Sequence, residues 1–143
     1  VKTESIGPAL NLVIAQRLVR RLCRFCKKKT EPAKDLKGKI SKFIKELPPR
    51  VDRSRCEKYE IYEPVGCDKC SGFGYKGREG IYEFFEGSEE LEKLILKEVS
   101  EVALKELAES QGMVTMQEDG VLKVLAGETS LEEVKSATGE IEW

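Results

Sequence analysis

The chain of 143 residues carries a formal net charge of −1, with 36 % charged and 40 % hydrophobic residues. This composition is typical of an ordered globular protein of one ordinary domain or two small ones, and it excludes an intrinsically disordered chain. The longest uncharged stretch, residues 5–16, is shorter than the roughly 20 apolar residues that cross a bilayer, so we expect no membrane insertion. The opening Val-Lys-Thr-Glu has neither an initiator Met nor an apolar signal segment, and it favours a piece cut from within a longer protein.

A helix is predicted over residues 8–22, near the start of the chain. Its apolar side chains recur with the 3.6-residue period of one helix face, and Pro8 suits the first turn. These apolar positions are Leu10, Val13, Ile14, Leu18 and Leu22. One face of this helix is therefore expected to be buried.

Two arginines are candidates for contacts with phosphate or with a neighbouring subunit, Arg17 in this segment and Arg78 further along the chain. A guanidinium can clamp a phosphate or a carboxylate in a forked geometry that Lys cannot reproduce. A salt bridge to an acidic neighbour such as Glu79 or Glu83 is the simpler explanation for these residues.

Four of the five cysteines form two Cys-x-x-Cys pairs, Cys23 with Cys26 and Cys67 with Cys70. An odd number of cysteines without a signal peptide argues against a disulfide scaffold. Two such pairs can supply four thiolates to one tetrahedral metal ion, for which zinc is the best candidate, while iron fits the same ligands. The fifth, Cys56, is expected to be a bystander.

A zinc ion held by four protein sulfurs has no open coordination position, so the predicted site is structural rather than catalytic. Gly72 and Gly74 follow the second pair and can adopt positive φ, which would turn backbone N–H groups toward the sulfurs. Basic residues beside the ligands would offset the negative charge of the thiolates. These are Arg24, Lys27, Lys28 and Lys69.

The basic residues are also unevenly divided along the chain. Residues 1–58 contain 17 Lys and Arg against 6 Asp and Glu, whereas residues 59–143 contain 8 against 20. A basic half can indicate nucleic-acid binding. Basic runs such as residues 27–29 are more commonly a solvent-exposed face, and we expect no nucleic acid.

Further elements follow from local patterns. A helix is predicted from Asp35 to Leu47, ended by Pro48 and Pro49, and a strand is predicted over residues 80–86 because that segment is aromatic and β-branched. Beyond Gly87 we expect four short helices that form a small acidic bundle. Their start and stop signals are Ser88, Ser100, the capping boxes Thr115 with Glu118 and Thr129 with Glu132, and the C-terminal Gly112 and Gly127.

The chain shows little sign of a catalytic centre of its own. It contains no His, which excludes His-dependent catalytic triads and His metal ligands, and no Gly-x-x-x-x-Gly-Lys-Ser/Thr phosphate loop. These 143 residues are therefore not expected to form a complete enzyme.

Three stretches and their order nevertheless resemble one family, the type II secretion and type IV pilus assembly ATPases. They are AQRLVRRLCRFC at 15–26, GCDKCSGFGYKGREGIYEF at 66–84, and GMVTMQEDGVLKVLAGETSLEEV at 112–134. The resemblance extends over most of the chain and is weakest between residues 30 and 60. The chain resembles the C-terminal end of such a protein.

The resemblance implies an α+β fold in four parts. Residues 1–22 would be the C-terminal helix region of a RecA-like P-loop ATPase core, and residues 23–74 a subdomain with a helical insert in which Cys23, Cys26, Cys67 and Cys70 hold zinc. Residues 75–87 would return to the core as a strand, and residues 88–143 would form a C-terminal helical subdomain.

The resemblance also implies a function for the parent protein. The family consists of hexameric, cytoplasmic motors, peripheral to the bacterial inner membrane, that use ATP hydrolysis for protein secretion or pilus assembly. ATP and Mg²⁺ would be held by motifs upstream of Val1, so the piece itself would be noncatalytic. Its partners would be neighbouring subunits and inner-membrane platform or cytoplasmic adaptor proteins.

A rival interpretation is a zinc-dependent nucleic-acid-binding or chaperone-like module. The basic half supports the first possibility, and CDKCSGFG at 67–74 matches one Cys-x-x-Cys-x-Gly-x-Gly repeat of the Hsp40 chaperones. That family would use several such repeats, and only one occurs here.

Overall fold

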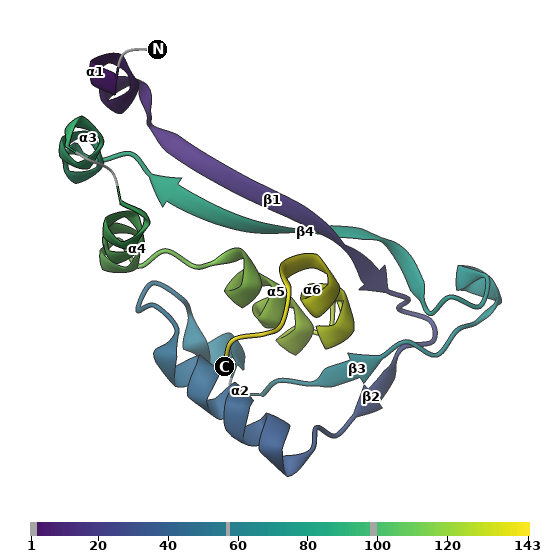
Figure 1. Cartoon of the computed structure of the whole chain (residues 1–143). Helices are drawn as coiled ribbons and strands as arrows, with labels where there is room; N and C mark the ends of the chain where they lie inside the picture. The colour runs from purple at the N-terminus through teal and green to yellow at the C-terminus, as the bar shows by residue number, and fades with distance from the viewer. Residues whose placement is uncertain (1–2, 57, 98–99) are drawn as a thin grey trace.

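A long two-stranded antiparallel ribbon runs through the computed structural model, which describes residues 3–56, 58–97 and 100–143. The ribbon pairs β1 (Leu12–Leu22) with β4 (Tyr75–Glu86), as Figure 1 shows in purple and teal. Leu12 lies opposite Glu86 and Arg20 opposite Arg78, and a register shift follows before Leu22 meets Tyr75. The ribbon therefore joins two segments that are more than fifty residues apart in the sequence.

The prediction of a helix over residues 8–22 was wrong. A short 3-10 turn at Gly7–Ala9 is followed, after Leu10 and Asn11, by strand β1. The apolar side chains that suggested a helix face do not form one buried stripe: Leu12, Ile14 and Leu18 are exposed, and only Val19 and Leu22 of the strand are buried. β-branched residues and a distant pairing partner outweigh the local period.

The strand expected over residues 80–86 is confirmed, and it begins earlier, at Tyr75. Ile81, in its middle, is fully buried, and so is Val19 of β1 to within 2 %. The pairing with β1 extends the strand back to Tyr75, before the start at residue 80 that the local pattern indicated. Together these two residues anchor the ribbon in the protein interior.

The excursion between the two ribbon strands forms a second small layer. It contains β2 (Lys28–Thr30), α2 (Lys34–Glu46), the 3-10 turn η2 (Arg53–Cys56), β3 (Ile61–Glu63) and the 3-10 turn η3 (Asp68–Cys70). Strands β2 and β3 pair in antiparallel fashion. The predicted helix at 35–47 is confirmed to within one residue at each end.

The excursion shares its hydrophobic core with the C-terminal part of the chain. The buried residues of this core are Ile40, Phe43, Leu47, Cys56, Ile61, Val121 and Leu125. Trp143 packs its ring edge-on against Phe43, with the ring centroids 6.4 Å apart. Cys56 is therefore a small apolar core residue.

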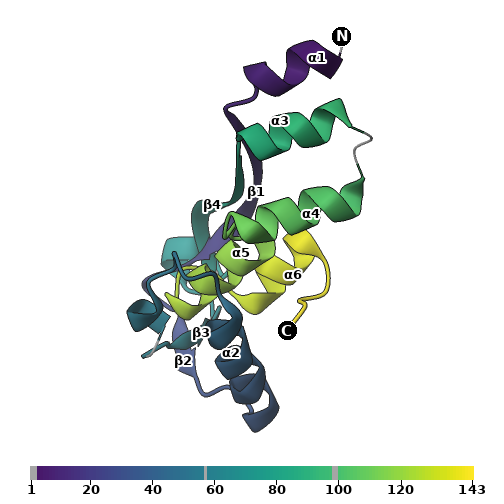
Figure 2. The same cartoon turned by 90° about the vertical axis from the view of Figure 1, so that its left-hand side faces the viewer.

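Four helices follow the ribbon: α3 (Glu89–Leu96), α4 (Glu101–Ser110), α5 (Met116–Leu125) and α6 (Leu131–Thr138). Figure 2 shows α1 (Thr3–Ile6), α3 and α4 stacked at one end of the ribbon, away from the excursion. Helices α5 and α6 pack against the ribbon, and their residues Val121, Val124 and Val134 are buried. None of the described helices is both long and apolar enough to span a bilayer.

Most of the expected helix signals are confirmed. Ser88 and Ser100 cap α3 and α4, and Thr115 with Glu118 forms the predicted capping box of α5. Gly112 and Gly127 adopt positive φ after α4 and α5.

The predicted position of the N-terminal cap of the last helix was wrong by one residue. Ser130 caps α6 and accepts a hydrogen bond from the Glu133 N–H. The hydroxyl of Thr129 instead donates to the Arg20 carbonyl at 2.8 Å. The Thr129 side chain, which the local pattern assigned to the cap, thus forms a long-range hydrogen bond to the ribbon instead.

A glycine substitution tests the packing of α5 on α6. A Cβ at Gly120 would lie 2.7 Å from Val134 Cγ1, whereas a Cβ at Gly38 in α2 would meet nothing within 4 Å. Gly38→Ala is expected to raise the free energy of unfolding by up to about 1 kcal/mol through helix propensity, and Gly120→Ala to lower it by about 1–3 kcal/mol through overpacking. Urea unfolding followed by circular dichroism measures both. Adding Val134→Ala should recover part of the Gly120→Ala loss; equal stability of the two single variants would refute this packing.

Candidate metal centre

The end of the ribbon brings the two cysteine pairs together. Cys23 and Cys26 follow the last residue of β1, and Cys67 and Cys70 precede the first residue of β4. The backbone N–H of Cys23 donates to the Gly74 carbonyl at 2.9 Å, which continues the strand pairing into both cysteine segments. Residues 44 positions apart therefore meet at one point because the strands that carry them are paired.

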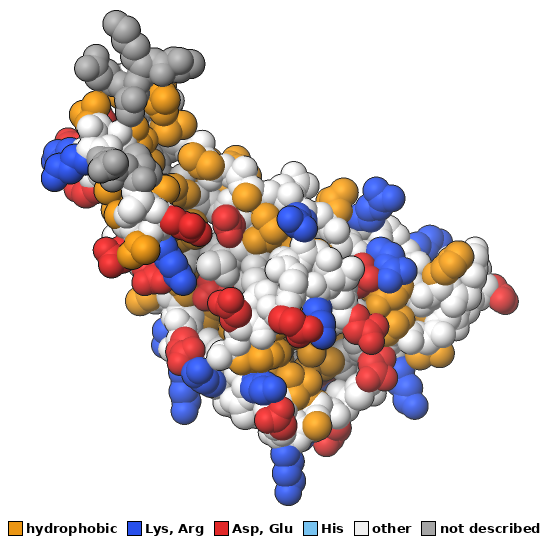
Figure 3. Space-filling view, viewed as in Figure 1, with side chains coloured by type: hydrophobic (Ala, Val, Ile, Leu, Met, Phe, Trp, Pro, Cys, Tyr) orange, Lys and Arg blue, Asp and Glu red, His pale blue; other side chains and the backbone are white. Residues whose placement is uncertain are grey.

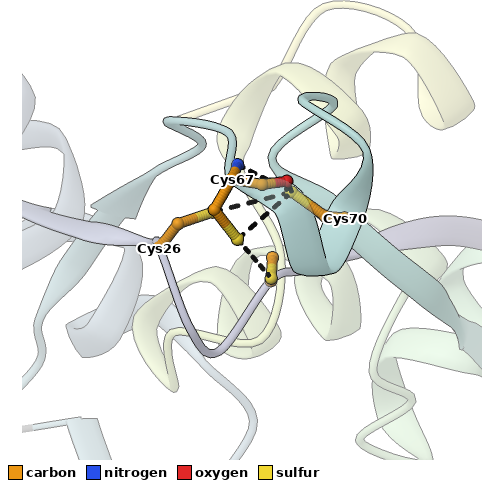
Figure 4. A group of neighbouring side chains, drawn as sticks. Cys26, Cys67 and Cys70 are labelled. Carbon is orange, nitrogen blue, oxygen red and sulfur yellow. Dashed lines mark hydrogen bonds between the residues drawn. The ribbon is translucent and has the colours of Figure 1, made fainter.

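The four sulfur atoms have the spacing of a tetrahedral ligand set. All lie within 4.8 Å of one another. The Sγ of Cys70 is 3.8 Å from those of Cys26 and Cys67, and the Sγ atoms of Cys23 and Cys67 are 4.0 Å apart. Metal–sulfur bonds of about 2.3 Å place the corners of a regular tetrahedron about 3.8 Å apart. The cluster therefore fits a metal such as zinc. Figure 4 shows the side chains of Cys26, Cys67 and Cys70 close to one another.

Backbone N–H groups surround two of the sulfurs. Cys70 Sγ accepts from Cys67 and Gly74, both at 3.2 Å, and Cys26 Sγ accepts from Gly66 at 3.3 Å. Such donors offset negative charge on ligating thiolates. Gly74 thus acts as the sequence predicts, whereas the N–H of Gly72 donates to the Cys67 carbonyl.

The sequence patterns did not indicate Gly66 as a backbone donor to a sulfur, although its position directly before Cys67 was an available signal for this role. The structure favours glycine at both positions. Gly66 and Gly74 each have positive φ, and a Cβ on Gly74 would lie 2.5 Å from the Cβ of Pro64. Side chains at these two positions would push the backbone donors away from the sulfurs.

The surroundings of Cys70 and of Cys26 shift the pKa values of these two thiols in opposite directions. Burial would by itself raise the pKa of the Cys70 thiol, but the N–H groups of Cys67 and Gly74 and the neighbouring thiols lower its pKa to about 6. Burial is the main cause that raises the pKa of Cys26 to about 11, against the opposing N–H of Gly66. Because thiolates are the ligating species, metal binding would release protons and weaken as the pH falls.

The basic residues near the cluster make several local contacts. Lys27 Nζ donates to the Gly127 carbonyl at 2.7 Å and lies 4.3 Å from the centre of the Tyr62 ring. The Arg24 guanidinium lies 4.8 Å from the Phe25 ring centre. Both line a cavity of about 440 Å³ that Cys23 also lines, so these two cations lie near this cysteine.

Arg17 and Arg78 lie apart from the sulfur cluster. Arg17 Nη1 donates to the Ala137 carbonyl at the end of α6, at 2.6 Å. Arg78 lies opposite Arg20 in the ribbon and lines a cavity together with Tyr75 and Phe73. Within the described ranges neither forms the ion pair with Glu79 or Glu83 that was the simpler explanation. Their roles as phosphate or subunit contacts stay predictions.

Arg20 and Glu133 form a connection that the sequence did not reveal. Both the backbone N–H and the Nε of Arg20 donate to the Glu133 carboxylate, at 2.8 and 2.9 Å. The Arg20 guanidinium also lies 4.2 Å from the Tyr75 ring centre, and the Tyr75 hydroxyl bonds to Ser130 at 2.9 Å. This network fastens α6 to the ribbon beside the cysteine cluster. No local pattern could indicate it, because the partners lie 113 positions apart.

The fold and the cluster together define a mixed α and β protein built on a ribbon whose end carries four converging cysteines. A model of the family described as type II/IV secretion system protein matches residues 1–136. The chain belongs to this family.

Several curated relatives are similar over nearly the whole chain. A type IV pilus assembly ATPase PilB of Pseudomonas aeruginosa is 36 % identical over 138 residues, which are 96 % of this chain and 23 % of the relative. PilB of Thermus thermophilus is 35 % identical over 98 % of this chain and 15 % of its own length. The type II secretion system ATPase E of Vibrio cholerae is 36 % identical over 94 % of this chain and 24 % of its own length. The chain thus spans at most about a quarter of each of these relatives.

Neutralising Glu133 tests the connection between α6 and the ribbon. Burial would raise the pKa of Glu133, but its bonds to Arg20 lower it below the usual value. The stabilisation that these bonds provide is therefore fully present above the pKa of a Glu side chain in the unfolded chain, near 4.3. It is lost as the pH falls through the lower pKa that Glu133 has in the folded chain. Glu133→Gln should reduce the free energy of unfolding at pH 7 by about 1–2 kcal/mol.

Urea unfolding between pH 7 and pH 3 measures this effect. The Glu133→Gln variant should lose less stability on acidification than the unsubstituted chain, because the substituted side chain no longer titrates. The neighbouring exposed Glu132 supplies the matched control, since Glu132→Gln should leave the pH profile nearly unchanged. Identical profiles for both variants would contradict the role of Glu133.

Proposed function

We propose that this chain is the C-terminal, zinc-binding part of a hexameric motor ATPase that powers type II protein secretion or type IV pilus assembly. The observation that carries the proposal is the tetrahedral spacing of the Cys23, Cys26, Cys67 and Cys70 sulfurs in a member of this family. The relatives named as pilus assembly and secretion ATPases support the motor assignment. The same family match favours this function over a nucleic-acid-binding or chaperone-like module.

The proposed role of the metal is structural. When bound, zinc would link the segment after β1 to the segment before β4 through four sulfur bonds, with no position left for water or substrate. The ligands lie at both ends of the excursion from residue 23 to residue 74, so the metal would close that excursion at its base. Zinc binding energy would then be folding energy for the excursion.

ATP hydrolysis is proposed for the parent protein and not for these residues. No phosphate loop of the Gly-x-x-x-x-Gly-Lys-Ser/Thr type occurs in the 143 residues, so ATP and Mg²⁺ would be held by other parts of the polypeptide. We further propose a cytoplasmic location at the bacterial inner membrane. Platform or adaptor proteins and neighbouring subunits would be the partners, with Arg17 and Arg78 as candidate phosphate or subunit contacts.

Metal analysis of the purified chain tests the zinc proposal. Protein prepared under reducing conditions without chelators should hold about one equivalent of zinc per chain. Cys67→Ser should lower this to well below half an equivalent and loosen the excursion, because it removes one of four ligands. Cys56→Ala is the matched control, since Cys56 lies in the hydrophobic core, and it should retain the zinc. Less than about half an equivalent in the unsubstituted chain would rule out the proposal.

A further inference from the structure

The turn between α5 and α6 is joined to the strand that leads into the first cysteine pair. The Leu22 N–H donates to the Glu128 carbonyl, and the Thr129 hydroxyl donates to the Arg20 carbonyl, both at 2.8 Å. Both bonds reach residues of β1, which the pairing with β4 holds in place. They involve no cysteine side chain, so these two bonds do not require a metal.

A third bond reaches the same turn from beyond the first cysteine pair. Lys27 directly follows Cys26, and its Nζ donates to the Gly127 carbonyl at 2.7 Å. The N–H groups of Cys26 and Lys27 both donate to the Cys23 carbonyl, at 3.2 and 2.9 Å. Lys27 is thus the last residue of the tight turn that carries the two sulfurs of the first pair, and its side chain crosses from that turn to the helices.

The place that receives the Lys27 ammonium group is closely built. Its Nζ lies 4.3 Å from the centre of the Tyr62 ring in β3, and the face of an aromatic ring attracts a cation. Gly127 has a φ of +71°, and a Cβ there would lie 2.8 Å from the Tyr62 ring and 3.2 Å from Lys27 Nζ. Gly127 is buried and Lys27 is half-buried, so this charge-assisted bond is stronger than one fully exposed to water.

Zinc would fix the part of this arrangement that the ribbon does not hold. A metal bound by Cys23 and Cys26 would keep the first cysteine turn in one conformation, because both ligands would be joined to one ion. The position of Lys27 follows from the shape of that turn. Its ammonium group therefore reaches Gly127 more often when the metal is bound than when the turn is free to change shape.

We propose that Lys27 is a positioning residue that couples zinc binding by the four cysteines to closure of the turn between α5 and α6. This rests on the proposed function, in which the chain binds zinc. The ion would then hold the C-terminal helices as well as the excursion, through a side chain that is not a ligand. By linkage, the closed turn raises the zinc affinity by the same factor by which zinc favours the closed turn.

The zinc affinity of variants of the chain tests the coupling. In competition with a chromophoric chelator, Lys27→Met should show a zinc dissociation constant about tenfold higher than the unsubstituted chain, because methionine keeps an unbranched side chain but donates no bond. Lys27→Arg restores a charged donor that also stacks on aromatic rings, and it should recover most of the affinity. Gly127→Ala displaces the same contact from the side of the helices and should also weaken zinc binding.

A control is needed for the general effect of charge, because several Lys and Arg side chains lie at the end of the molecule that carries the cysteines, as Figure 3 shows in blue. Lys28→Met is matched to Lys27→Met, since Lys28 is the next residue, is exposed and lies opposite Glu63 in the pair of β2 and β3. It should change the dissociation constant less than about twofold. Equal losses for the two methionine variants, or no loss for Lys27→Met, would overturn the coupling.

Hydrogen exchange followed by mass spectrometry gives the reciprocal measurement. In the unsubstituted chain, removal of zinc should speed amide exchange in residues 126–131, whereas in Lys27→Met exchange there should be fast with and without zinc. Helix α4, at the far end of the ribbon in Figure 2, should exchange equally in both proteins, which shows that the variant is folded. Protection of the turn by zinc to the same extent in both proteins would contradict the role of Lys27.

The unsubstituted chain separates this inference from the proposed function. If that chain binds no zinc, both the zinc proposal and the coupling are wrong. If the unsubstituted chain and Lys27→Met bind zinc with the same affinity, the coupling alone is wrong and the proposed zinc site is supported.

Discussion

The pairing of β1 with β4 is the constraint on which the remaining structure depends. Its register places Leu22 opposite Tyr75, so the chain leaves the ribbon and returns to it at the same point. Each cysteine pair lies within a few residues of that point. The forty residues between Cys26 and Cys67 need no regular geometry of their own to bring the sulfurs together, because the ribbon has already closed the loop. Loop length then costs little further free energy.

The ribbon end and the helices α5 and α6 support each other. The turn between these helices bonds to Leu22 and Lys27, and α6 bonds to Arg20. The excursion adds its own core residues to those of α5. Zinc would therefore act at a junction of three parts of the fold, and its loss would loosen contacts well beyond the four ligands. Such a junction suits a structural metal better than a catalytic one.

The sequence was sufficient where the signal was local. Two Cys-x-x-Cys pairs indicated the four cysteines whose sulfurs converge, and Ser88, Ser100 and Thr115 marked the starts of helices. The prediction failed where distant contacts determine the structure. The segment 8–22 has helical spacing, but its residues 12–22 form the strand that pairs with β4, and Thr129 bonds to Arg20 instead of capping α6. The Arg20–Glu133 bond was equally hidden, since neither residue has a local pattern that names its partner.

X-ray absorption at the zinc edge of the metal-loaded chain tests the central claim most directly, namely that four sulfurs from the two ends of the excursion hold one ion. Four sulfur neighbours at about 2.3 Å are the predicted result. Nitrogen or oxygen neighbours in place of two of the sulfurs would contradict it, because the two cysteine pairs would then not share the metal.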